Sequence, residues 1–194
     1  MPDATNDEDV MTTSEHIVEP SAGAGWLRRA LDKKAALAAF VLGLATILGA
    51  WGSQLIGGLF PCELCLEQRW AYYWGLPLLA AVLVFWNRLP LTVWYLAMAV
   101  VAAIFLWGAY MGAYHAGVEW GFWPGPTSCT GTGTAIDFNQ LNDINAARIV
   151  PCDVVQFRFL GISLAGYNAL ISLAIVGLLL TSIVDQWRRT RRLA

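Results

Sequence analysis

Two cysteines separated by two residues, Cys62 and Cys65, are the part of the sequence best suited to chemistry. This tight C-x-x-C spacing is used for reversible redox chemistry, in which the thiolate is the reactive form. Arg69 follows Cys65 by four residues, so both side chains would lie on one face of a helix that begins near Cys65. The helix dipole and the guanidinium would both favour a Cys65 thiolate. The alternative for Arg69 is an interfacial anchor whose head reaches the lipid headgroups.

Cys129 and Cys152 bring the number of cysteines to four. Four cysteines allow three pairings, and the tight spacing favours Cys62–Cys65 with Cys129–Cys152 as the second pair. A zinc site is disfavoured, because Cys129 and Cys152 have 22 residues between them and no local C-x-x-C or histidine partner. We therefore predict no metal. Two inert structural disulfides are an alternative, but they do not explain a C-x-x-C at a membrane edge.

The composition indicates where these cysteines are held. Of the 194 residues, 57% are hydrophobic and 13% are charged, against about 45–50% and about 25% in typical soluble domains. Such a chain is not expected to be a soluble globular enzyme, a disordered protein or a nucleic-acid-binding protein. The composition predicts a domain whose partner is the lipid bilayer.

Four long runs without Asp, Glu, Lys or Arg follow an acidic leader: 35–61, 70–87, 89–118 and 159–184. A bilayer core of about 30 Å requires about 20 apolar residues as helix, and each run is long enough, the second only just. The runs lack strict alternation, which favours helices over a closed barrel. The predicted fold class is therefore an all-α membrane protein, a bundle of four transmembrane helices.

The basic residues predict the orientation of this bundle. Nine of the twelve Lys and Arg residues lie on one side of the membrane if there are four spans: Arg28, Arg29, Lys33, Lys34, Arg88, Arg188, Arg189, Arg191 and Arg192. The positive-inside rule makes that side the cytoplasm, with both termini inside. The loops 62–69 and 113–158 are then extracytoplasmic, and the oxidising compartment favours disulfides among their cysteines.

The domain boundaries follow from charge. Residues 1–25 contain six acidic residues and no Lys or Arg, which predicts a disordered acidic tail. Residues 26–187 are predicted to form the membrane domain, and 188–194 a basic cytoplasmic C-terminus. Within the second loop, Thr134 and Asp137 resemble a capping box, which predicts a short helix lying on the membrane.

The motifs together resemble those of a known family. The segment 61–69, with Cys62, Cys65 and Arg69 after a first apolar run, resembles the bacterial disulfide bond formation protein B (DsbB) family. The similarity covers about residues 30–185 and includes further segments: Tyr114–Trp120 with His115 and Glu119, Gly125–Cys129, Cys152–Asp153, Phe159–Gly161 and Asn168. It implies a multi-pass protein of the bacterial inner membrane with its redox loops in the periplasm.

The resemblance also implies a function and roles for individual residues. The chain would reoxidise a periplasmic DsbA-like thiol oxidase and pass the electrons to the membrane quinone pool, as ubiquinone or menaquinone. The partner's thiolate would attack Cys129 and release Cys152, in an aqueous loop within reach of a soluble protein. Exchange with Cys62 would carry the oxidation state between the loops, and Cys65 would then reduce the quinone. Quinone-binding residues would be Arg69, Cys65 and His115. Apart from the resemblance, the spacing of four residues between His115 and Glu119 suggests a proton relay to the quinol, and the alternative is an interfacial histidine that only satisfies its hydrogen bonds.

Two other functions compete with this one. A vitamin K epoxide reductase-like enzyme would also combine a four-helix membrane bundle, a C-x-x-C and a quinone. In that family the C-x-x-C belongs to a late helix, whereas here it opens the second one. The other alternative is a structural membrane protein stabilised by disulfides, whose bonds would resist mild reduction.

Overall fold

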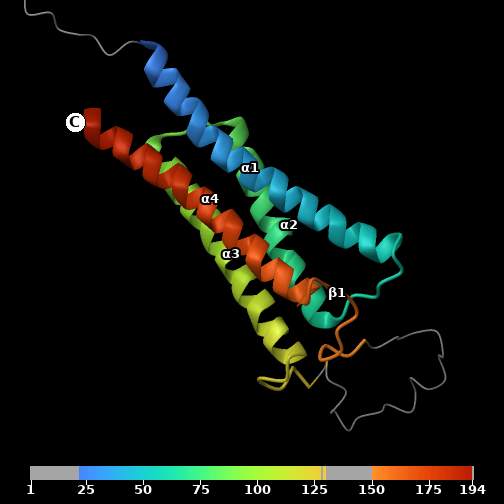
Figure 1. The fold of residues 1–194 in the computed structure, drawn as a ribbon. Helices are drawn as coiled ribbons and strands as arrows, with labels where there is room; N and C mark the ends of the chain where they lie inside the picture. Colours follow the sequence, from blue (N-terminus) through green and yellow to red (C-terminus); the bar gives the residue numbers. More distant parts are fainter. Residues whose placement is uncertain (1–21, 128, 130–149, 194) are drawn as a thin grey trace, which may run out of the picture.

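The computed structural model describes residues 22–127, 129 and 150–193 (Figure 1). These residues form four helices and one pair of two-residue strands: α1 (Ala22–Leu55), α2 (Glu63–Val84), α3 (Leu91–Glu119), β1 (Arg158–Phe159), β2 (Ile162–Ser163) and α4 (Leu164–Leu193). The predicted short helix that begins near Thr134 lies outside the described residues.

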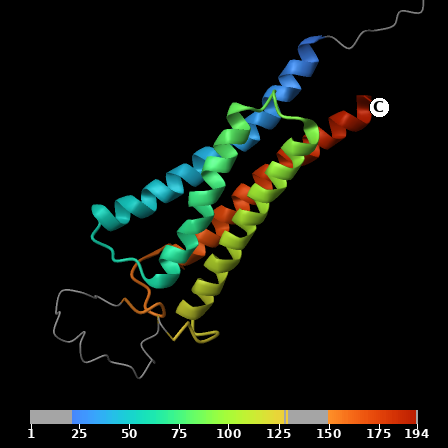
Figure 2. The ribbon, with the colours of Figure 1, turned by 180° about the vertical axis from the view of Figure 1, so that it is seen from behind.

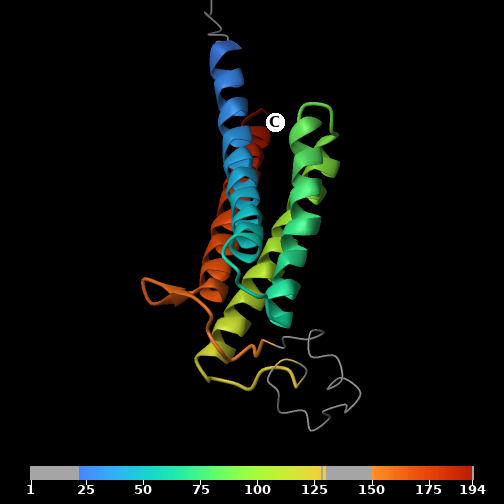
Figure 3. The same ribbon diagram turned by 90° about the vertical axis from the view of Figure 1, so that its right-hand side faces the viewer.

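The helices lie side by side in an elongated bundle (Figures 1, 2 and 3). The start of α1, the turn between α2 and α3, and the end of α4 lie at one end, here named the turn end. The loop between α1 and α2, the end of α3 and the strand pair lie at the opposite end, here named the cysteine end. The C-x-x-C and the segment that contains Cys152 therefore meet at the same end of the bundle, although they are far apart in the sequence.

Three helical segments among the described residues are long and apolar enough to cross a membrane: Lys33–Leu55, Leu91–Glu119 and Leu164–Arg192. The bundle is therefore that of a membrane protein, as the composition predicts. Helix α2 packs against α1 and α3 but does not meet the same criterion. Its apolar part is short and begins with the less apolar aromatic residues Trp70, Tyr72, Tyr73 and Trp74. A fourth crossing by α2 stays a prediction.

The helix boundaries differ from the predicted ones in three places. Helix α1 begins at Ala22, within the predicted tail, and α4 continues through the basic segment to Leu193. Basic side chains at a helix C-terminus complement its dipole, which favours this continuation. Helix α4 begins at Leu164 instead of 159, because the preceding residues form the antiparallel pair β1–β2. The turn between β1 and β2 has Leu160 and Gly161 at positive φ, a conformation that interrupts regular structure. Because of this strand pair, the fold is not strictly all-α as predicted.

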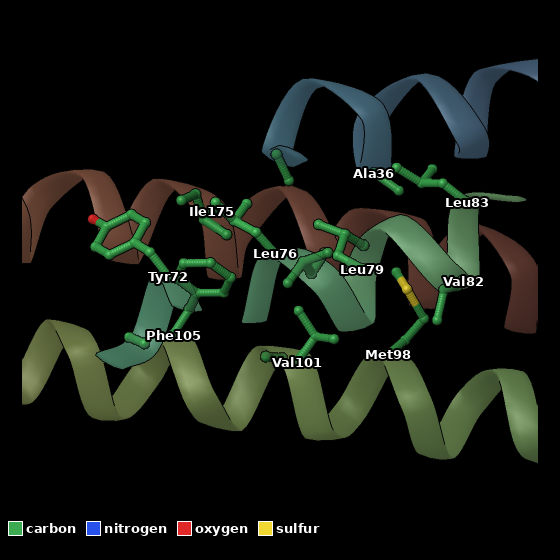
Figure 4. Close-up of a cluster of buried hydrophobic side chains, with 14 of the residues drawn as sticks. Ala36, Tyr72, Leu76, Leu79, Val82, Leu83, Met98, Val101, Phe105 and Ile175 are labelled. Atoms are coloured by element: carbon green, nitrogen blue, oxygen red, sulfur yellow. The ribbon is translucent and has the colours of Figure 1, made fainter. Parts of the chain in front are cut away.

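The middle of the bundle is packed with apolar side chains (Figure 4). Phe105, Met98 and Leu79 are fully buried there between α2, α3 and α4. Closer to the cysteine end, Gly112 permits a tight approach of α3 to α4, because a Cβ at this position would lie 2.7 Å from the backbone nitrogen of Ala169. Close approach at small residues is typical of membrane helices, and it fixes the position of α4 relative to the end of α3.

Candidate redox site

The C-x-x-C begins helix α2. Cys62 is the N-cap residue, and its sulfur accepts a hydrogen bond from the backbone N–H of Cys65 at 3.3 Å. The two sulfurs are 2.6 Å apart, and both cysteines are free thiols. Cys65 therefore lies in the first turn of α2, as predicted, and its own backbone N–H is directed at the Cys62 sulfur. The Cys62–Cys65 disulfide stays a prediction for another redox state.

The two thiols precede the apolar stretch 70–87 and differ in acidity. The hydrogen bond with Cys65, together with burial, raises the pKa of the Cys62 thiol. The hydrogen bond from Cys62 lowers the pKa of Cys65. Burial and the charge of Glu119 oppose this shift, and the charge of Arg69 assists it. The pKa of Cys65 is thus lowered and that of Cys62 raised, which is the order that the motif predicts, although the thiol of Cys62 lowers the pKa of Cys65 more than Arg69 does.

Cys129 and Cys152 form a disulfide with their Cα atoms 5.4 Å apart, which confirms the predicted pairing. The backbone N–H of Cys152 donates to the carbonyl of Cys129 at 3.0 Å. Both cysteines are 1% exposed, packed with Cys62, Leu64 and Val118. The prediction that this pair is accessible in an aqueous loop is wrong for this structure, because the disulfide packs in an apolar cluster at the end of α3.

His115, from the end of α3, connects the two cysteine pairs. Its Nε2 lies 3.7 Å from the Cys62 sulfur and 3.2 Å from the Cys152 carbonyl oxygen, and 4.0 Å from a carboxylate oxygen of Glu119. The sulfurs of Cys62 and Cys152 and a ring nitrogen of His115 all lie within 4.8 Å of one another. A metal ion would require thiolate ligands, and Cys152 offers none while it is bonded to Cys129. The cluster thus places a free thiol and a disulfide sulfur beside one imidazole.

A chain of polar side chains that the sequence analysis did not assign continues from His115 into the bundle. The amide nitrogen of Gln68 lies 2.7 Å from His115 Nδ1. The amide of Asn168 donates to the Gln68 oxygen at 2.7 Å, and the Tyr72 hydroxyl donates to Asn168 at 2.6 Å. Asn168 and the segment that contains Gln68 are part of the family resemblance. In addition, each of the three residues places an amide or hydroxyl near or within an apolar run, which is costly in a membrane and therefore indicates a role.

A cavity of about 410 Å³ lies beside this cluster. Its polar lining includes Cys62, Cys65, Arg69, His115 and Glu119, and its apolar lining comes from α1, α4 and the loops next to them. The Arg69 guanidinium donates to the side-chain oxygen of Gln54 on α1 at 2.8 Å. Among the described residues, one buried oxygen of Glu119 has no hydrogen-bond partner. The cavity thus brings together every predicted site residue except the disulfide pair, which lies directly behind Cys62.

Comparison with known families agrees with this geometry. The family described as disulfide bond formation protein DsbB matches residues 32–182, which is more than half of the chain. Comparisons with curated proteins and with solved structures give no significant match. The matched residues include all four cysteines, Arg69 and His115. The chain belongs to the DsbB family of membrane disulfide oxidoreductases.

Proposed function

We propose that this protein takes two electrons from a periplasmic DsbA-like thiol oxidase and delivers them to a membrane quinone. The observation that carries the proposal is the contact between the two cysteine pairs, with Cys62, Cys152 and His115 within 4.8 Å, at the wall of a cavity that Cys65 and Arg69 also line. A purely structural role does not account for two free thiols placed against a disulfide.

The thiol steps balance in bonds and electrons. A partner thiolate attacks Cys129, forming a mixed disulfide while the Cys129–Cys152 bond breaks and its electron pair leaves on Cys152. The second partner thiolate then releases Cys129. The Cys152 thiolate attacks Cys62 of an oxidised C-x-x-C, and the electron pair leaves on Cys65. Attack of Cys129 on Cys152 finally restores the loop disulfide and leaves both C-x-x-C cysteines reduced, which is the pairing seen in the structure.

The residues around the cavity fit a quinone headgroup. Cavities of about 300–1,000 Å³ with a mostly apolar lining and a few polar groups are typical of small-molecule sites, and the volume here is about 410 Å³. Arg69 supplies a planar donor suited to a carbonyl oxygen, and His115 and Glu119 offer groups that can hold protons. When bound, a quinone supplies an acceptor for two electrons and two protons. Cys65, the more acidic thiol of the pair and part of the cavity wall, would be the cysteine that donates electrons to the quinone.

Attack on Cys129 requires a rearrangement, because its side chain is 1% exposed. A partner that reaches this sulfur must separate the Cys129–Cys152 bond from Leu64 and Val118. This need for opening would keep the disulfide from reacting with other thiols at random.

The proposal places the cysteine end on the periplasmic side of the bacterial inner membrane and both termini in the cytoplasm. The clustering of basic residues at the turn end supports this orientation, and α2 then serves as the fourth span. Alkaline phosphatase fused at residues 87–90 should be inactive, whereas a fusion after Pro126 should be active. Activity at residues 87–90 would contradict the orientation.

The central test is quinone-dependent oxidation of a reduced DsbA-like protein by the purified chain in proteoliposomes. We expect turnover only when ubiquinone or menaquinone is added. A reduced partner that keeps only its attacking cysteine should be trapped on Cys129, because its thiolate breaks the Cys129–Cys152 bond and it has no second thiol to release the mixed disulfide. Trapping only on Cys62 or Cys65 would contradict the order of transfer. Absence of turnover with either quinone would contradict the function.

A further inference from the structure

The polar chain behind His115 has a defined donor and acceptor order. The Gln68 amide nitrogen donates to the backbone carbonyl of Leu64 at 3.2 Å, and a carbonyl oxygen can only accept. The Asn168 nitrogen lies 3.4 Å from the carbonyl of Gly108 and 2.7 Å from the Gln68 oxygen. These contacts fix the orientation of both amides, so the group that faces His115 is the N–H of Gln68.

The order of the chain determines where His115 carries its proton. Nδ1 lies 2.7 Å from the Gln68 N–H and must accept. A neutral imidazole has one donor and one acceptor nitrogen, so its proton is on Nε2. The surroundings of Nε2 agree independently, since the Cys152 carbonyl at 3.2 Å can only accept a hydrogen bond.

We propose that Gln68 is a positioning residue that holds His115 as the Nε2–H tautomer, so that the ring presents a hydrogen-bond donor to the sulfur of Cys62. In the opposite tautomer, the Nε2 lone pair would face the Cys152 carbonyl and a Glu119 carboxylate oxygen, which are both electron-rich. His115 therefore acts at this sulfur as a donor and not as a base.

The consequence for exchange rests on the proposed function. When the Cys129 thiolate attacks Cys152 of a Cys62–Cys152 bond, the Cys129–Cys152 bond forms and the electron pair leaves on Cys62. The Nε2–H group lies 3.7 Å from that sulfur and would stabilise the departing anion. Loss of a hydrogen bond to a charged group corresponds to about a 10- to 150-fold change in the rate it controls, which is the reduction expected in this exchange step when the tautomer is reversed.

The tautomer can be measured directly. The chain contains two histidines, His16 and His115, so a His16→Gln variant labelled with ¹⁵N-histidine reports on His115 alone. In proteoliposomes without quinone, ¹⁵N NMR should show a protonated Nε2 and an unprotonated Nδ1. In Gln68→Glu the carboxylate can only accept, so Nδ1 should become protonated.

Gln156→Glu is the matched control, because Gln156 also lines the cavity but bonds to the carbonyl of Phe60. It adds the same charge and should leave the His115 spectrum unchanged. A protonated Nδ1 in the parent protein would overturn the proposal. The parent spectrum therefore tests the tautomer even if Gln68→Glu does not fold. A folded Gln68→Glu with an unchanged spectrum would also overturn it. If the parent protein shows the expected ¹⁵N spectrum but no quinone-dependent turnover, the result counts against the proposed function alone.

Discussion

Around Phe105, Met98 and Leu79 the bundle is filled with apolar side chains, whereas around His115 it is filled with groups that depend on hydrogen bonds. The apolar part holds its helices by shape and small residues, since lipid is as apolar as the side chains it would replace. At the cysteine end, each donor must meet an acceptor, because an unpaired buried polar group is costly. A substitution of similar volume should therefore be tolerated in the apolar part and damaging at the cysteine end.

The largest expected effect is that of Cys65→Ser, which removes one sulfur and changes little in volume. Without this sulfur the C-x-x-C cannot become a disulfide, so quinone-dependent oxidation of the partner should fall to background. The measurement is turnover in proteoliposomes. Trapping of a partner that keeps only its attacking cysteine on Cys129 of the Cys65→Ser chain, whose Cys129–Cys152 bond is intact, is the control for folding. Turnover above background in Cys65→Ser would show that the quinone does not receive its electrons from this cysteine.

Arg69→Ala should have the next largest effect. Removing a charge-assisted hydrogen bond costs about 1.5–3 kcal/mol, or about 10- to 150-fold, which we expect as a rise in the apparent quinone KM. Arg69→Lys keeps the charge but loses the planar donor set, so its apparent quinone KM should lie between those of the parent protein and Arg69→Ala. Gln54→Leu is the matched control, because it removes the α1 partner of Arg69 and leaves the guanidinium in place. Unchanged quinone kinetics in Arg69→Ala would make Arg69 an interfacial anchor.

The pH dependence of alkylation should separate the two C-x-x-C thiols. The hydrogen bond from Cys62 lowers the pKa of Cys65, so the Cys65 thiolate persists below the midpoint of about 8.5 of a free cysteine. Alkylation of Cys65 should therefore fall only as the pH drops through this lowered pKa, and Cys62, whose pKa is raised, should react at higher pH. Cys62→Ala removes the donor and should move the Cys65 midpoint upward. Mass spectrometry of the reduced protein identifies the site, and earlier alkylation of Cys62 would contradict the assignment.

How much of each region the sequence predicts depends on whether its signal is local. The apolar runs predict the helices because their signal is local, and the spacing of Cys62, Cys65 and Arg69 predicts a reactive pair for the same reason. The marginal second run is the one whose helix does not meet the criterion for a span. The start of α4 was missed because the apolar residues 159–163 form a turn and strand pair instead of a helix.

The contacts at the cysteine end required the three-dimensional structure. Gln68 and Asn168 are 100 residues apart and His115 lies between them in sequence, so no local pattern reveals that they form one chain. The burial of Cys129 and Cys152 depends on packing against Leu64 and Val118, which a loop sequence does not show. Sequence spacing predicts a reactive cysteine pair, which stays a prediction, while the order of donors and acceptors around it is given only by the fold.

The smallest expected effects test the apolar part. Met98 is fully buried, and Met98→Leu conserves its volume, so the free energy of unfolding should change by less than about 1.5 kcal/mol with unchanged quinone turnover. Phe105 is equally buried, but its ring contacts Tyr72 edge-on with the ring centroids 5.5 Å apart, and Tyr72 is the end of the polar chain to His115. Phe105→Leu should therefore lower turnover more than Met98→Leu, since it removes a contact that holds Tyr72 against Asn168. Thermal unfolding and turnover measured together distinguish the two residues. An equal loss of turnover in both variants would show that substitutions in the apolar part disturb the cysteine end wherever they are made, and that the two regions do not differ in their tolerance.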